Sequence, residues 1–302
     1  MPSPEPNTSK RTTFLRRSAS TLGLWGIVAA AFASRWAWAY VGMMGVLTLI
    51  ATLEYFRMMK ADGVKCFPRF GMLLAGVYSG LAYWLLLGGD KLGAGQVVEL
   101  PTGFDGAAIF IAVAGAFTLQ LRHPIRGREP LQAVAANLLG FVYIAFLFNF
   151  SARLVFMVPG EGQVPGAMLL LWMIAVTKFT DMGAYIVGSA IGRHKMIPHV
   201  SPGKTWQGFG GALLFSQLAG CGLYALFPKS LAILTSWGHV IFLGVLLALL
   251  AVVGDLAESV VKRSLNAKDS GNMLPGIGGA LDLIDSLCFT APALYFYIKW
   301  VL

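Results

Sequence analysis

Two pairs of acidic residues in the last third of the chain have the type and spacing for metal-assisted chemistry. Asp255 and Glu258 lie three residues apart, and Asp282 and Asp285 repeat that spacing. Residues three apart share one face of a helix. Four carboxylates close together and away from water repel one another unless a cation lies among them, and a hard divalent cation fits. We therefore predict a Mg2+ site with Asp255 and Asp282 as principal ligands and Glu258 and Asp285 as adjoining or outer ligands.

Two basic loops that contain glycine and proline supply groups able to hold phosphates. One loop lies between the acid pairs, the other covers 192–205, and together they contribute Ser201, Lys204, Thr205, Lys262, Arg263, Lys268, Gly278 and Gly279. Backbone N–H groups beside glycine can approach phosphate oxygens closely. Phosphate-binding loops next to a carboxylate-bound cation indicate phosphoryl or nucleotidyl transfer. The simpler alternative is that the acids form ion pairs with Lys262, Arg263 and Lys268 at the membrane surface.

The elements that carry these groups are predicted to be membrane-spanning helices. Apolar residues make up 57% of the 302 residues and charged residues only 12%, and the mean hydropathy is +0.69. A soluble domain has about 25% charged residues. The chain has too little polar material to cover a water-facing surface, which excludes an ordinary soluble protein.

The apolar runs divide the chain into spans and loops. A helix needs roughly 20 mainly apolar residues to cross a bilayer. We predict an all-α polytopic membrane protein with about nine transmembrane helices, over 22–34, 36–56, 70–89, 107–122, 132–149, 167–191, 206–227, 238–261 and 280–301. The turn between the first two is very tight, so 22–56 also fits one span and an interfacial helix. We assign a tail (1–21), N-terminal helices (22–165) and a catalytic region (166–302) with inner loops 192–205 and 262–279.

Basic residues gather on alternate loops of this arrangement. One side holds 17 of them, namely Lys10, Arg11, Arg16, Arg17, Arg57, Lys60, Lys65, Arg69, Arg122, Arg126, Arg128, Arg193, Lys195, Lys204, Lys262, Arg263 and Lys268. The other side holds five, namely Arg35, Lys91, Arg153, Lys229 and Lys299. Cytoplasmic loops carry such an excess. We predict a cytoplasmic N-terminus and active site in the inner membrane, and we assign the net charge of +9 to anionic lipid rather than nucleic acid.

The last inner loop resembles a known family signature. From Ser259 to Asp285 the chain follows S-x-x-K-R-x4-K-D-x-G-x2-L-P-x-H-G-G-x-x-D-R-x-D, the signature of the phosphatidate cytidylyltransferase (CDP-diacylglycerol synthase) family. Two positions depart from it, since the histidine is Ile277 and the arginine is Leu283. The upstream elements agree: Asp181-Met-Gly183-Ala184-Tyr185, Gly192-Arg-His-Lys195, Ser201-Pro202-Gly-Lys204-Thr205-Trp206-Gln-Gly208 and Gly254-Asp255-Leu-Ala-Glu258.

The resemblance implies a reaction and roles for the residues. CTP and phosphatidate would give CDP-diacylglycerol and pyrophosphate for phospholipid biosynthesis, with Mg2+ as cofactor. The residues expected to act in catalysis are Asp255, Asp282, Asp285 and Lys268. Phosphates are expected on Ser201, Lys204, Thr205, Lys262, Arg263 and Lys268, close to Gly278 and Gly279. Asp181 is expected in the site, at a break of its helix near Gly183.

The two departures and the rival functions lead to further expectations. We expect an active, divergent member in which Lys178, a lysine near the middle of the predicted span 167–191, replaces part of the lost positive charge. The same fold acting on another lipid phosphate is the nearest alternative. A lipid transporter would spread polar groups through the membrane depth and show internal symmetry, and neither pattern is present. The sequence leaves open a second cation and a homodimer.

Overall fold

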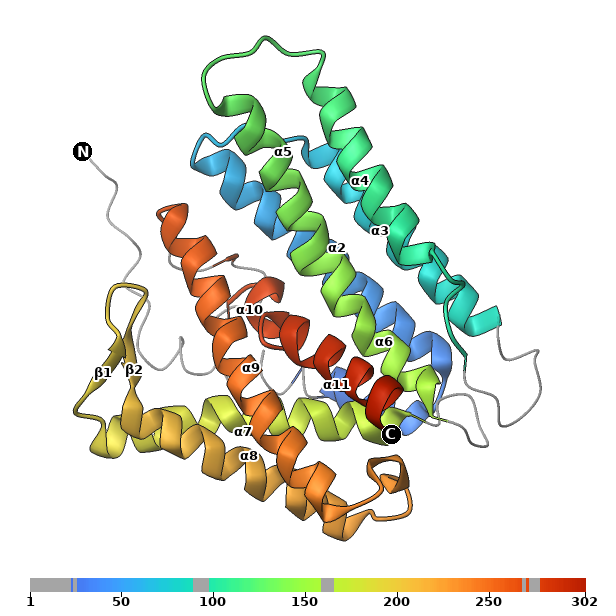
Figure 1. Ribbon diagram of the computed structural model, residues 1–302, viewed down its shortest axis with the longest axis vertical. Coiled ribbons are helices and arrows are strands. Elements are labelled where there is room, and N and C mark those ends of the chain that lie inside the picture. The colour runs from blue at the N-terminus through green and yellow to red at the C-terminus, as the bar shows by residue number, and fades with distance from the viewer. Residues whose placement is uncertain (1–22, 24–25, 89–97, 159–165, 268–269, 272–277) are drawn as a thin grey trace.

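The apolar runs fold into helices, and these make up nearly all of the regular structure (Figure 1). The computed structural model describes residues 23, 26–88, 98–158, 166–267, 270–271 and 278–302. The N-terminal half contains α2 (Ala37–Ala61), α3 (Pro68–Gly88), α4 (Phe104–Gln120), α5 (Glu129–Gly140), the π-helix η2 (Phe141–Phe146) and α6 (Leu147–Met157). The C-terminal half contains α7 (Ala167–Ile191), β1 (Lys195–Ile197), β2 (Ser201–Thr205), α8 (Trp206–Leu226), the 3-10 helix η3 (Ala232–Leu234), α9 (Trp237–Ser264), α10 (Ala280–Ile284) and α11 (Leu287–Val301).

Seven helices of the described chain are long and apolar enough to cross a membrane. Helices α5, η2 and α6 form one of these continuous spans, and α10 with α11 forms another. Helix α4 is apolar but only 17 residues long, at the lower limit for a span. Residues 26–34 are also helical, but the predicted first span 22–34 lies partly outside the described residues. A nearly all-α architecture with several candidate membrane spans is therefore confirmed, whereas the count of nine spans and the cytoplasmic N-terminus stay predictions.

The predicted span 132–149 is longer in the structure, where helix continues to Met157. The predicted span ended before Arg153 and left that residue in a loop, but its side chain is buried within the helix. Its guanidinium donates to both carboxylate oxygens of Asp105, at 2.8 and 2.6 Å, and to the hydroxyl of Tyr78 at 2.8 Å. This bidentate pairing lets the helix carry a charge within the protein, because a buried ion must have a partner.

Helices α7 and α8 lie side by side and antiparallel along one edge of the molecule (Figure 1). Glycines make the close approach possible, as is usual for helices in lipid. A side-chain carbon at Gly183 would lie 2.6 Å from the Cβ of Phe215, and one at Gly208 would lie 2.8 Å from the carbonyl oxygen of Ala184. The expected break of the helix at Gly183 is wrong, since α7 runs unbroken to Ile191. Gly183 serves helix packing instead.

The loop 192–205 forms a small antiparallel hairpin between α7 and α8 (Figure 1). Lys195 pairs with Thr205 and Ile197 with Ser201. Thr205 then begins α8, because its hydroxyl accepts the N–H of Gly208 at 3.1 Å and caps the helix. The hairpin therefore holds the predicted phosphate-binding residues on a folded element.

The two halves of the chain share one apolar core. Its buried residues come from α2 and α6 as well as from α7, α9, α10 and α11. Helix α2 contacts α10, and α6 contacts α11. The N-terminal helices thus support the short helix α10, which carries Asp282 and ends just before Asp285.

Candidate functional site

A polar cavity of about 760 Å3 lies where α7, the hairpin, α9 and α10 meet. It is lined by most of the residues that the sequence singled out, namely Asp181, Ser201, Lys204, Thr205, Asp255, Glu258, Lys262, Asp282 and Asp285, and also by Lys195. Residues more than 100 positions apart in the sequence therefore face one space. The fold brings the proposed metal ligands and phosphate-binding groups together.

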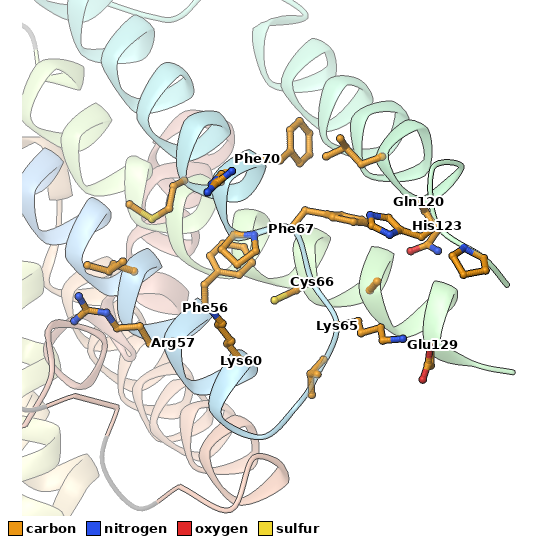
Figure 2. Close-up of a pocket in the computed structure, with 18 residues that line it drawn as sticks. Phe56, Arg57, Lys60, Lys65, Cys66, Phe67, Phe70, Gln120, His123 and Glu129 are labelled. Atoms are coloured by element: carbon orange, nitrogen blue, oxygen red, sulfur yellow. Dashed lines mark hydrogen bonds and ion pairs between the residues drawn. The ribbon is translucent and has the colours of Figure 1, made fainter. Parts of the chain in front are cut away.

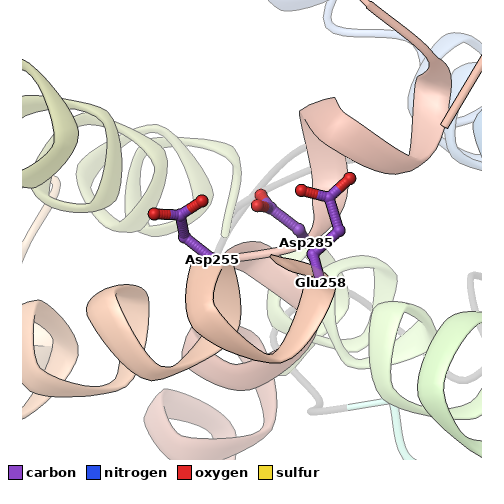
Figure 3. Close-up of side chains that lie close together, drawn as sticks. All are labelled: Asp255, Glu258 and Asp285. Atoms are coloured by element: carbon purple, nitrogen blue, oxygen red, sulfur yellow. The ribbon is translucent and has the colours of Figure 1, made fainter. Parts of the chain in front are cut away.

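Three carboxylates form the centre of this cavity (Figure 3). One oxygen each of Asp255, Glu258 and Asp285 lies within 4.8 Å of the others. Glu258 is 2% exposed and Asp285 5% exposed, and the Glu258 Oε1 atom is buried without a hydrogen-bond partner among the described residues. An unpaired buried carboxylate oxygen is costly. The three side chains fit a hard divalent cation, which takes oxygen ligands.

Backbone packing at Gly254 brings these three acids together. A side-chain carbon at Gly254 would lie 2.8 Å from the Cα of Ser286 and 2.9 Å from the carbonyl oxygen of Asp285. Because Gly254 has no side chain, α9 can approach the junction between α10 and α11, where Asp285 lies. The Ser286 hydroxyl donates to the carbonyl of Ala251 across the same contact, at 3.2 Å. The glycine before Asp255 thus sets the distance between the two acid pairs.

Asp282 lines the cavity but lies outside the group of three. Its Oδ1 atom accepts from the Lys262 amine at 2.8 Å, and its Oδ2 atom accepts the N–H of Gly279 at 2.6 Å. Helical dihedral angles continue through Asp285 and Ser286, and the Asp285 N–H donates to the Leu281 carbonyl at 3.0 Å, so Asp282 and Asp285 both line the cavity from one turn of helix. Asp282 therefore binds Lys262 and the backbone at the start of α10. Asp285, rather than the predicted Asp282, lies close to Asp255.

Lysines partly neutralise the acids. Lys204 forms an ion pair with Asp255, and Lys262 bridges Glu258 at 2.9 Å and Asp282 at 2.8 Å. The ion-pair alternative from the sequence is thus realised in part. Five acids line the cavity, however, against the three lysines Lys195, Lys204 and Lys262. The acids that line the cavity therefore outnumber its lysines.

Lys178 lies next to one of the two positions that depart from the signature. Its amine donates to the carbonyl oxygen of Leu283 at 3.1 Å and lies 4.0 Å from a carboxylate oxygen of Asp181. Leu283 itself packs against the apolar core and contributes no charge. The lysine amine thus lies beside the backbone of the position at which the signature has an arginine, and it also makes the ion pair with Asp181.

Three of the predicted residues that the structure describes do not line the cavity. Arg263 is exposed and does not line the cavity. Gly278 adopts a positive φ of 115° beside Asp282, and Gly279 donates its N–H to that carboxylate, so both shape the start of α10. Lys268 lies outside the described residues. Thr205 lines the cavity while its hydroxyl caps α8.

Sequence reasoning missed Glu54, a buried acid on α2. The side chain is 4% exposed, and its Oε2 atom accepts the N–H of Leu281 at 3.0 Å. Side-chain carbons at Gly271 and Gly279 would lie 2.6 and 2.7 Å from its carboxyl carbon, so both glycines leave room for it. An acid inside an apolar run is a functional hypothesis by default, and that signal was present in the predicted span 36–56. Glu54 anchors α10 to the N-terminal half.

Comparison with known proteins gives a consistent result. The model of the cytidylyltransferase family matches residues 15–301. A phosphatidate cytidylyltransferase of Mycobacterium bovis is 33% identical over 281 residues, which cover 90% of this chain and 83% of the relative. A phosphatidate cytidylyltransferase of Brucella suis is 42% identical over 196 residues, covering 65% of this chain and 57% of the relative. The uncharacterized protein YnbB of Escherichia coli is 30% identical over 265 residues, covering 87% and 80%. The resemblance seen in the signature is confirmed: the chain belongs to the cytidylyltransferase family.

Proposed function

We propose that the chain transfers the cytidylyl group of CTP to phosphatidate, giving CDP-diacylglycerol and pyrophosphate for phospholipid biosynthesis. The observation that carries the proposal is the cavity in which five acids and three lysines face one another at one end of the membrane helices. Family membership and the relatives named phosphatidate cytidylyltransferase support the same reaction. A lipid transporter has no such support.

In this reaction a phosphate oxygen of phosphatidate attacks the α-phosphorus of CTP. The bond from the α-phosphorus to the bridging oxygen breaks, and pyrophosphate leaves. Phosphatidate is already an anionic nucleophile, so the protein has to bring two polyanions together and stabilise the developing charge rather than remove a proton. Ser201, Lys204 and Lys262 line the cavity and are assigned to phosphate oxygens.

Mg2+ is the proposed cofactor, held by Asp255, Glu258 and Asp285. When bound, the cation would neutralise charge on the phosphates. Asp282 is assigned to Lys262 and the Gly279 N–H rather than to the cation. Asp181 borders the cavity next to Lys178 and is assigned to the nucleotide side. Lys268 stays a proposed phosphate-binding residue from the signature.

We propose that the cavity faces the cytoplasm in a cell membrane. The hairpin and the end of α9 carry Lys195, Lys204, Lys262 and Arg263, the bases of the positive side. The opposite-side bases Arg153 and Lys299 pair with Asp105 and Glu99. CTP would then come from the cytosol and the lipid from the cytoplasmic leaflet.

A second candidate is the same transfer to another lipid phosphate. It is favoured by Leu283, which puts an apolar side chain that packs against the core at a position where the signature has a cationic one, between the cavity residues Asp282 and Asp285. A change of charge on that side alters which headgroup fits.

One assay tests both candidates. The purified full chain is incubated with Mg2+, CTP labelled in the α-phosphate, and phosphatidate or other lipid phosphates. We expect labelled CDP-diacylglycerol with phosphatidate and no product without Mg2+. Product only with another lipid phosphate would replace phosphatidate by that acceptor. No labelled lipid with any acceptor would contradict the proposed function.

A further inference from the structure

A second pocket, of about 800 Å3, lies between the ends of α2 and α4 and the starts of α3 and α5 (Figure 2). It shares no lining residue with the cavity of the acids. Its volume is within the range of roughly 300–1,000 Å3 that is usual for small-molecule sites. The reaction proposed above uses none of its residues.

The walls of this pocket are apolar and held in place by packing. The larger apolar side chains are those of Leu53, Phe56, Phe67, Phe70, Met72 and Leu119. Phe67 stacks on His123 with ring centroids 5.6 Å apart, as Figure 2 shows. Gly71 and Gly115 lie directly against the rings of Phe56 and Phe70, where a larger residue would collide. The apolar space is therefore part of the fold.

The rim of the pocket is basic. Arg57, Lys60, Lys65 and Arg69 line it, and Glu129 is the one acid among its lining residues. Lys65 pairs with Glu129 on the α5 side (Figure 2), whereas no ion pair among the described residues involves Arg57, Lys60 or Arg69. All three of these side chains are exposed. The rim thus offers three positive charges to an anion from outside.

The pocket lies at the same end of the helices as the cavity of the acids. Asp62, which caps α2 beside the rim, accepts a hydrogen bond of 3.0 Å from Asn266, just after α9. Both openings therefore lie at one membrane face, where lipid phosphates and basic side chains meet. Basic side chains around an apolar groove at this membrane face fit a lipid whose phosphate group contacts the bases and whose acyl chain fills the groove.

We infer that this pocket binds an anionic glycerophospholipid of the membrane, separately from the reacting lipid. The phosphate lies against Arg57, Lys60 and Arg69, and one acyl chain lies between Phe56, Phe67 and Phe70. The inference does not depend on the proposed transfer reaction. The lipid would hold the α2–α3 pair against α4 and α5.

Photolabelling of the full chain in phosphatidylcholine nanodiscs tests this site. The probe is phosphatidylglycerol with a photoactivatable acyl chain, and the same chain on phosphatidylcholine is the reference. We expect phosphatidylglycerol to label peptides containing Phe67, Phe70 or Met72 about tenfold more strongly than phosphatidylcholine, because basic clusters attract anionic lipid. Equal labelling by both probes would overturn the inference.

Variants distinguish lipid binding in this pocket from the general attraction of anionic lipid to basic side chains at the membrane surface. Arg57→Gln, Lys60→Gln and Arg69→Gln combined should lower the labelling to the phosphatidylcholine level. Arg126→Gln with Arg128→Gln, two exposed bases that do not line the pocket, should leave it unchanged. Met72→Trp, which fills the groove without changing charge, should also lower it. If the triple variant labels like the Arg126/Arg128 control, the basic rim does not bind the lipid.

Two further experiments identify the class of ligand and separate its binding from the transfer reaction. Excess inorganic phosphate should not displace the phosphatidylglycerol label, because it has no chain for the groove. Full displacement would show a phosphate site and contradict lipid binding. Asp255→Asn should keep the label while losing cytidylyl transfer, so that failure of one proposal is distinguishable from failure of the other.

Discussion

At the scale of single residues, the site is a set of carboxylates whose charge exceeds that of the neighbouring lysines. Asp255, Glu258 and Asp285 converge, and two of them are paired, Asp255 with Lys204 and Glu258 with Lys262. Burial makes each uncompensated charge expensive. Removing one carboxylate should therefore affect cation binding more than it affects folding.

Asp255→Asn should lower cytidylyl transfer by at least about 100-fold and raise the Mg2+ concentration needed for half-maximal rate. Asparagine is nearly isosteric but carries no charge to hold the cation. Initial rates over a Mg2+ series measure the effect. Glu99→Gln, an exposed acid paired with Lys299, is the matched control and should retain full activity. Near wild-type activity of Asp255→Asn at limiting Mg2+ would refute the ligand assignment.

Lys178→Met should lower transfer about tenfold if this lysine replaces the missing arginine. Its contact with the Leu283 carbonyl places it beside that position. Restoring the signature with Ile277→His and Leu283→Arg should then recover part of the rate. If the only role of Lys178 is its ion pair with Asp181, restoring the signature residues should not raise the transfer rate of Lys178→Met. In that case Lys178→Met with Asp181→Asn should unfold at a higher temperature than Lys178→Met alone. An unchanged rate in Lys178→Met would rule out compensation.

At the scale of elements, glycines and one buried acid decide how the helices place the site. Gly254 lets α9 touch the α10–α11 junction, and the glycines of α7 and α8 bring the hairpin to the cavity. In lipid, helices associate largely through such close packing. Changes at these contacts should disturb the geometry without removing a reacting group.

Gly254→Ala should destabilise the protein by about 1–3 kcal/mol, the usual cost of overpacking, and lower transfer strongly. The added carbon would meet backbone atoms of Asp285 and Ser286, which cannot turn away as a side chain can. Thermal unfolding in detergent and initial rates measure the two effects. Gly222→Ala in α8, where nothing lies within 4 Å, should change neither. Full activity and stability of Gly254→Ala would contradict this role of the glycine.

Glu54→Ala should destabilise the protein by about 1–3 kcal/mol, because the buried N–H of Leu281 loses its acceptor. Transfer should fall as well, since α10 carries Asp282. Glu54→Gln keeps an acceptor oxygen and should lie between the wild type and Glu54→Ala in both measurements. Equal stability of Glu54→Ala and the wild type would show that the N-terminal half does not anchor α10 through this acid.

At the scale of the whole molecule, the bases gather at one end of the helices, together with both cavities. The hairpin, the end of α9 and the start of α3 carry Lys195, Arg263 and Arg69. The turn between α8 and α9 lies at the other end of those helices and carries Lys229. The asymmetry predicts which end faces the cytoplasm.

Single cysteines in a chain without Cys66, Cys221 and Cys288 test this orientation. Arg193→Cys should react with a membrane-impermeant thiol reagent only after the cells are permeabilised. Lys229→Cys should react in intact cells. Both positions are exposed, so access depends on the side of the membrane. Labelling of Arg193→Cys in intact cells would reverse the proposed orientation.

The sequence alone determined the membrane class, most of the helices, the family and the acids that line the cavity. Composition fixes whether a chain can face water, and apolar runs must become helices in lipid, since backbone groups have no other partners there. The motif order then identified the acids and loop lysines. These properties are local, so they can be read without knowing how the helices pack.

Only the tertiary structure decided which side chains meet. Spacing indicates that Asp282 and Asp285 share one helix face, but only packing decides that Asp285 joins Asp255 and Glu258 while Asp282 pairs with Lys262. The unbroken helix at Gly183, the anchoring by Glu54 and the basic-rimmed pocket also depend on contacts between distant segments. Periodicity fixes one face of each helix, whereas the rotation and distance between helices follow from packing, above all where glycine lets backbones touch.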